Sequence, residues 1–92
     1  MATKRNPGAY DCYTNAAEDE PMFVLLGRDP MAGILIKLWV QLRQDAGEDP
    51  AKLEEAMLCA LMCDRYAIGL GKTERIKAAV ESLARLRTPV GP

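Results

Sequence analysis

The stretch RDPMAGILIKLWVQLRQDAGEDPAKLEEAMLCALMCDRYAIG, residues 28–69, decides the fold because it carries the same helix-start signal twice. Asp29 and Asp49 suit the N-cap position, where the side-chain oxygen accepts a hydrogen bond from a backbone N–H. Pro30 and Pro50 suit the first helical position, where a missing N–H leaves nothing unpaired. Each Asp-Pro pair therefore predicts the start of a helix.

The two predicted helices, at about 30–46 and 50–67, end at glycines. Gly47 and Gly69 are placed to take the left-handed backbone conformation that commonly closes a helix. The Gly-Glu-Asp link between the helices is so short that they must fold back on each other. The sequence thus predicts a small antiparallel helical hairpin.

Apolar residues recur at helical spacing along both helices and define the sides that we expect to be buried. In the first helix they are Met31, Ile34, Leu35, Leu38, Trp39, Leu42 and Ala46, with Ile36 and Val40 beside them. In the second helix they are Leu53, Met57, Ala60, Leu61 and Ile68. The broad apolar arc of the first helix indicates burial on more than one side. We therefore expect Ile36, Trp39 and Val40 to contact a second copy or a partner.

Three further segments complete the prediction of an all-α fold. Thr73 can cap a third helix at about 74–87, because apolar residues repeat there at helical spacing. A short helix is expected near 21–26, since Pro21 suits a first turn and no partner strand for the apolar run is visible elsewhere. Residues 1–19 show no periodicity and should form an extended arm. The predicted organisation is an N-terminal arm at 1–19, a single helical domain at 20–88 and a tail at 89–92.

Composition limits the size and class of the protein. The chain has 92 residues, of which 49% are hydrophobic and 27% charged, which is typical of one globular domain. A domain this small buries little surface, so oligomerisation would stabilise it. No apolar run approaches the roughly 18 residues of a membrane span, and the N-terminus carries no secretory pattern. We therefore expect a cytoplasmic protein.

The reactive side chains favour a protein that is not an enzyme. The sequence contains no histidine, the most frequent general acid or base. Cys59 and Cys63 lie one helical turn apart and could face one metal ion. However, Cys12 is the only further thiol, and zinc sites usually have four ligands. We expect three free cysteines, no metal site and no cofactor.

Charge is unevenly distributed along the chain. Residues 1–64 hold six Lys or Arg against eleven Asp or Glu, whereas residues 65–92 hold six against two. This imbalance can be neutralised within one molecule or between copies, or it can attract an anionic partner to the C-terminal third. A pI near 5.4 argues against nucleic acid as a partner.

Gly71, Lys72 and Thr73 resemble the end of a phosphate-binding loop. The first glycine of that loop is missing, because Tyr66 stands five residues before Gly71. The two glycines can simply form a turn before a helix cap, or the helix start can hold a phosphate without hydrolysing it. In the second case the anion- or nucleotide-binding residues are Tyr10, Tyr13, Arg28, Lys72 and Arg75.

One part of the chain, at about residues 10–43, resembles a group of small phage and prophage proteins. The matching features are a Tyr-Asp-Cys-Tyr block at 10–13, Asp-Glu-Pro with an apolar run at 19–26, Arg-Asp-Pro at 28–30, and a helix that bears Trp39. No functional residue is carried over from this resemblance.

The phage resemblance implies a small accessory protein that acts by binding in the host cytoplasm. It favours a host-defence antagonist, either an anti-CRISPR-like blocker of a host protein complex or a sponge for a small signalling nucleotide. The alternatives are a structural or assembly subunit of a phage particle and a small nucleic-acid-binding protein. We also expect a homo-oligomer and no contact with membranes.

Overall fold

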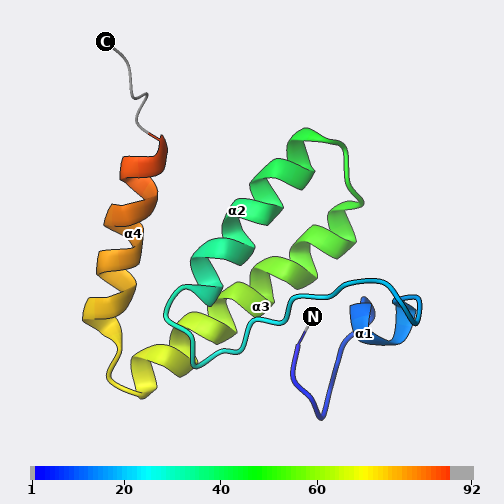
Figure 1. The fold of residues 1–92 in the computed structure, drawn as a ribbon, viewed down its shortest axis with the longest axis horizontal. Helices are drawn as coiled ribbons and strands as arrows, with labels where there is room; N and C mark the ends of the chain where they lie inside the picture. Colours follow the sequence, from blue (N-terminus) through cyan, green and yellow to red (C-terminus); the bar gives the residue numbers. More distant parts are fainter. Residues whose placement is uncertain (1, 88–92) are drawn as a thin grey trace.

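The computed structural model describes residues 2–87 and folds them into four helices without a β-strand. The helices are α1 at Cys12–Asn15, α2 at Ala32–Asp45, α3 at Pro50–Gly69 and α4 at Thr73–Arg87. α2 and α3 lie side by side and antiparallel, whereas α4 turns away from the end of α3 (Figure 1). The expected all-α fold is confirmed. The predicted tail at 89–92 lies outside the described residues.

Both Asp-Pro pairs stand at helix starts. Asp49 Oδ1 accepts a hydrogen bond from the Ala51 N–H (3.0 Å), and the proline that follows Asp49 is the first residue of α3. Asp29 Oδ1 accepts from the Met31 N–H (2.9 Å). Here the helix begins two residues later than predicted, because residues up to Met31 form a turn closed by a hydrogen bond from the Ala32 N–H to the Asp29 carbonyl (3.0 Å).

Both hairpin helices end with a left-handed glycine, but only one of these glycines was predicted. Gly47 follows α2 with a φ of +83°. The prediction for Gly69 is wrong, because Gly69 is the last residue of α3 and Gly71 has the positive φ, +78°. A left-handed residue at Gly71 lets the Lys72 N–H reach back to the Ala67 carbonyl (3.0 Å), which pairs a helix-end carbonyl.

The predicted short helix near 21–26 is wrong, because residues 21–26 have no regular secondary structure. A lone helix of six residues is unstable without packing, and Phe23 and Val24 remain exposed. The N-terminal arm instead contains the one-turn helix α1. Asp11 caps α1 by accepting from the Tyr13 N–H (3.2 Å).

Small side chains form the interface between α2 and α3. Among the described residues the buried apolar side chains are Ala32, Val40, Leu53, Ala56, Ala60, Cys63, Ala67 and Ala79. The prediction that Met57, Leu61 and Ile68 lie on the buried side of α3 is wrong, because all three are exposed. α3 is apolar on more than one side, and alanines allow the closer approach of the two helices. The larger side chains are left outside.

Asp64 ties α3 to the first two turns of α2. Its Oδ2 atom lies 2.6 Å from Lys37 Nζ, and its carboxylate also lies against Gly33, where any side chain would collide with it. A carboxylate near a helix N-terminus is favoured by the helix dipole. Gly33 is therefore required at this crossing because it leaves room for the carboxylate.

The turn between α3 and α4 is connected to the turn before α2. Lys72 Nζ donates a hydrogen bond to the Arg28 carbonyl (2.6 Å). Beyond this turn α4 leads away from the end of α3 (Figure 1), and its residue Ala79 is buried. Of the helices in residues 2–87, none has the length and apolar character needed to cross a membrane.

Candidate functional site

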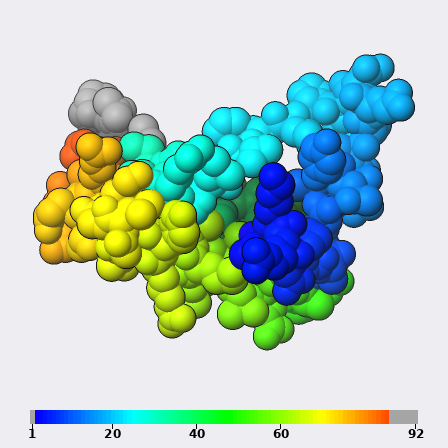
Figure 2. Space-filling model, turned by 90° about the horizontal axis from the view of Figure 1, so that it is seen from below, coloured from blue at the N-terminus to red at the C-terminus, as the bar shows by residue number. Residues whose placement is uncertain are grey.

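The N-terminal segment folds back onto the start of α3. The Ala9 N–H donates to Glu55 Oε1 (2.7 Å), and the Tyr10 N–H donates to Glu55 Oε2 (3.1 Å). The Tyr10 hydroxyl donates to Asp49 Oδ2 (3.1 Å). Figure 2 shows this segment in dark blue against the green of α3, with the following residues in light blue projecting from the body of the molecule.

The folded-back segment and α2 enclose a groove with a volume of about 720 Å³. We call it the arm groove, and its lining residues are Tyr10, Cys12, Asn15, Ala16, Glu20, Pro21, Met22, Phe23, Leu25, Leu35, Ile36, Trp39 and Lys52. Most of these side chains are apolar. The size and character of the groove suit an apolar side chain or short segment of a partner.

Two of the three predicted contact residues line the arm groove. Ile36 and Trp39 are only partly buried, and each reaches the groove from α2. Val40 is 8% exposed and packs against Leu53 and Ala56 of α3, so the chain itself covers it. The broad apolar arc of α2 therefore divides into a side that faces α3 and a side that faces the groove.

Several large apolar side chains that line the arm groove, and the neighbouring Val24, are exposed. Phe23 is 84% exposed and Val24 is 67% exposed, on the irregular segment that follows α1. Leu35 on α2 and Met22 are also exposed. Exposed apolar side chains thus lie both on the irregular segment and on the groove-facing side of α2.

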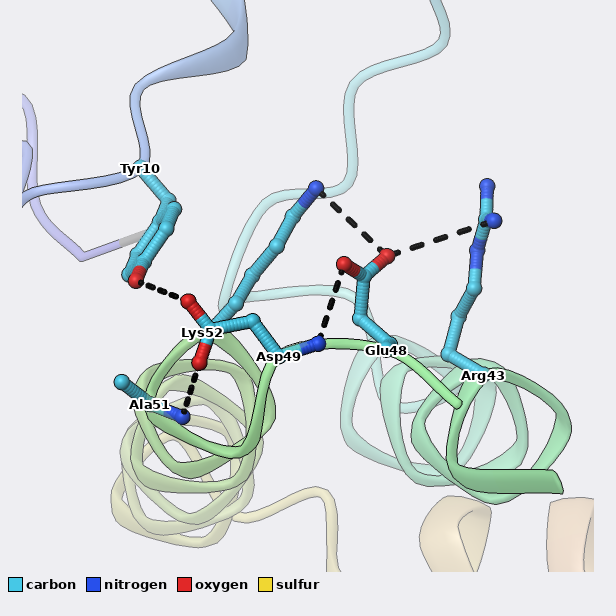
Figure 3. Close-up of polar contacts among 6 residues, drawn as sticks. All are labelled: Tyr10, Arg43, Glu48, Asp49, Ala51 and Lys52. Atoms are coloured by element: carbon cyan, nitrogen blue, oxygen red, sulfur yellow. Dashed lines mark hydrogen bonds and ion pairs between the residues drawn. The ribbon is translucent and has the colours of Figure 1, made fainter. Parts of the chain in front are cut away.

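Charged residues border the groove at Trp39. The Arg43 guanidinium lies 5.6 Å and the Lys52 ammonium 5.9 Å from the centre of the Trp39 ring, which is within the range of cation–π attraction. Glu48 Oε2 lies 4.0 Å from Arg43 and 3.8 Å from Lys52. Figure 3 shows these three side chains beside Asp49 and the Tyr10 hydroxyl. The tryptophan thus has a defined position at the edge of the groove.

The residues predicted to bind an anion are divided between the two ends of α3. Lys72 and Arg28 meet beyond its C-terminus, where Lys72 donates to the Arg28 backbone carbonyl, and Arg75 is exposed on the first turn of α4. Tyr10 contacts the N-terminus of α3, and Tyr13 is 76% exposed on α1. Because α3 has 20 residues, its ends are about 30 Å apart.

Carboxylates surround the Tyr10 hydroxyl. The hydrogen bond to Asp49 is the main reason why the pKa of Tyr10 is raised above 10, and Glu55 and Glu48 add to the effect. The same negative field opposes the approach of a phosphate. The two tyrosines and the basic residues therefore do not form one anion site within a single chain.

Cys59 and Cys63 line a second groove of about 410 Å³, together with residues 2–4 and 25–28. This groove lies along the C-terminal half of α3. Burial raises the pKa of the Cys63 thiol to about 11, and the neighbouring Cys59 adds to the shift. Within the described part of the chain, no three His, Cys, Asp or Glu side chains are placed to hold a metal ion. All three cysteines are free.

Sequence reasoning missed Glu55, the residue that binds the N-terminal segment. We placed no weight on its carboxylate because acidic residues usually face solvent. Its partners Ala9 and Tyr10 lie 46 and 45 positions away, which no local pattern reveals. The one available signal was Pro7-Gly8, a dipeptide that is typical of turns.

Comparison of the chain with protein families, with curated proteins and with solved structures gave no match.

Proposed function

We propose that this chain is a non-enzymatic, phage-type accessory protein that works as a host-defence antagonist by binding a host protein complex through the arm groove. The observation that carries the proposal is the distribution of apolar side chains. The interface between α2 and α3 is built mainly from alanines, while Met22, Phe23 and Leu35, which line the groove, are exposed. Such a surface supports binding of an apolar protein segment.

The exposed area supports self-association as a second part of the proposal. The chain exposes 7378 Å², whereas a compact monomer of this size exposes about 5300 Å². The excess of about 2000 Å² is more than twice the roughly 800 Å² that each partner buries in a standard interface. We therefore expect a homo-oligomer, with the basic C-terminal third of one copy near the acidic remainder of another.

A sponge for a signalling nucleotide is the second candidate. It is supported by the placement of Tyr10 and Tyr13 at one end of α3 and of Lys72 and Arg75 at the other end. Neither group alone can hold both a base and a phosphate. Two copies placed end to end would bring the tyrosines of one beside the basic residues of the next.

Restoration of phage growth tests the blocker directly. The chain is expressed in bacteria whose protein-based immunity restricts an unrelated phage, and plaques are counted. We expect the intact chain to restore plaques and Phe23→Asp to abolish this effect, because a charge on the groove edge opposes apolar contact. Ile68→Asp is the matched control, since Ile68 is 51% exposed and lines neither groove. Equal activity of both variants would contradict the proposal.

Light scattering followed by thermal denaturation with cyclic di- and trinucleotides tests the sponge. A rise in melting temperature with one nucleotide, abolished by Lys72→Glu with Arg75→Glu, would favour the sponge over the blocker. If no nucleotide raises the melting temperature, the result favours the blocker of a host protein complex over the sponge. An oligomer that neither restores plaques nor binds a nucleotide would favour a structural or assembly subunit of the particle.

A further inference from the structure

A single carboxylate holds two successive backbone N–H groups of the N-terminal segment. Glu55 Oε1 and Oε2 accept from Ala9 and Tyr10 at 2.7 and 3.1 Å. Both oxygens of one carboxylate are thus engaged by adjacent residues of the same turn. Hydrogen bonds to a charged acceptor are stronger than neutral ones, so this contact fixes both the position and the direction of the segment.

Gly8 makes the close approach to Glu55 feasible. Its φ is +81°, a conformation that residues with a side chain rarely adopt. A Cβ atom at this position would also lie 2.6 Å from Glu55 Oε1. Glycine is therefore required here by its conformation and by the space that the carboxylate occupies.

The docked segment supplies one wall of the arm groove. Tyr10, which Glu55 holds, and Cys12, two residues later, line the same groove as Ile36 and Trp39 of α2. The α2–α3 interface is formed by other residues, in particular Leu53 and the alanines around it. Loss of the Glu55 contact should therefore remove the wall and leave the hairpin folded.

We infer that Glu55 is a positioning residue that docks the N-terminal segment onto α3 and thereby builds the outer wall of the arm groove. The inference rests on the proposed function in one respect, which is that the groove is where a partner binds. Its structural part stands on the contacts between Glu55, Gly8 and Tyr10, and is tested without any partner.

Glu54 provides a matched control because it precedes Glu55 on the same helix and is exposed. We compare Glu55→Ala and Glu54→Ala in the full chain by amide hydrogen exchange, read by NMR at Ala9 and Tyr10. We expect exchange to accelerate at least about tenfold in Glu55→Ala, in line with the loss of a charge-assisted contact, and to stay unchanged in Glu54→Ala. Far-UV circular dichroism should show the same helix content in both variants.

The fluorescence of Trp39 reports on the groove itself, because it is the single tryptophan of the chain. Acrylamide quenching should increase in Glu55→Ala, since Tyr10 and Cys12, which line the same groove as the indole, are released. Gly8→Ala tests the same contact from the side of the N-terminal segment and should reproduce both changes. Glu54→Ala should show neither.

Three results would overturn the inference. The first is that amide exchange at Ala9 and Tyr10 is unchanged in both Glu55→Ala and Gly8→Ala. The second is that exchange becomes faster but the quenching of Trp39 does not change. The third is that Gly8→Ala loses helix content. Failure of the proposed function gives a different pattern. In that case the wall would open as described, while plaque restoration would be absent even in the intact chain.

Discussion

The hairpin of α2 and α3 and the N-terminal segment, residues 2–27, are stabilised in different ways. The hairpin has an aspartate at each start, a left-handed glycine after each helix and a continuous interface of small side chains. The N-terminal segment has one helical turn and is attached by hydrogen bonds to Glu55 and Asp49. The difference indicates that the hairpin is the scaffold and that the segment is a separately attached part, which supplies much of the arm groove.

The largest expected effect is on the hairpin interface. Leu53 is 9% exposed and packs with Val40 and Ala56. Leu53→Ala should lower the free energy of unfolding by about 2–4 kcal/mol, because it removes buried surface and leaves a cavity. Urea denaturation followed by circular dichroism measures this change. Leu58→Ala, at a position 56% exposed, should change it by less than about 0.5 kcal/mol. An equal loss of unfolding free energy in Leu53→Ala and Leu58→Ala would contradict the placement of Leu53 in the α2–α3 interface.

The second largest expected effect is on the contact between Gly33 of α2 and Asp64 of α3. Gly33→Ala should destabilise the chain by about 1–3 kcal/mol, because the new methyl group would displace the Asp64 carboxylate and its contact with Lys37. Gly69→Ala is the control, since Gly69 has open space around it and is helical. That substitution should stabilise the chain by about 0.5 kcal/mol. Thermal denaturation of both variants shows whether each substitution stabilises or destabilises the chain. An unchanged stability in Gly33→Ala would contradict the close approach of the Asp64 carboxylate to Gly33.

Thiol reactivity compares the N-terminal segment with the hairpin in one experiment. Cys12 is exposed, whereas Cys63 is buried and has a pKa raised to about 11. Because the thiolate is the reacting form, Cys63 should be alkylated at least about tenfold more slowly than Cys12 at pH 8. Peptide mapping after timed iodoacetamide treatment gives both rates. Faster reaction at Cys63 would indicate that the hairpin opens before the segment is released.

The smallest effect concerns pH. Tyr10 has a raised pKa, so the folded chain holds the phenolic proton more tightly than the unfolded chain does. The Tyr10 contribution to docking is therefore complete below pH 10 and is lost as pH rises through the folded pKa. Ultraviolet titration, with the Tyr10 signal identified by its loss in Tyr10→Phe, should show Tyr10 ionising at a lower pH in Asp49→Asn than in the intact chain. An unchanged Tyr10 titration in Asp49→Asn would contradict the hydrogen bond to Asp49.

The sequence predicted the hairpin well because its signals are local. The Asp-Pro pairs and Gly47 specify where the helices begin and end through contacts a few residues apart. The buried sides were predicted less well, because α2 and α3 are apolar on several sides and periodicity alone does not show that alanines face inward. Ile36 and Trp39 were chosen from the breadth of that apolar surface, and they line the groove.

The N-terminal segment could not be predicted in the same way. Its position depends on Glu55, which is distant in sequence, and its one-turn helix depends on the cap at Asp11. Residues 21–26 were assigned to a helix because Pro21 suits a helix start. Among the residues that the structure describes, no helix covers the exposed Phe23 and Val24, so packing does not stabilise a helix in this segment.

Hydrogen exchange of the intact chain as a function of urea tests the central claim, which is that the N-terminal segment is attached separately to a stable hairpin. The Ala9 and Tyr10 amides should exchange through a local opening, with low protection that urea hardly changes. The Ala56 and Ala60 amides should exchange with higher protection that falls steeply with urea, as expected for global unfolding. Equal protection and equal urea dependence at the two sets of amides would contradict the claim.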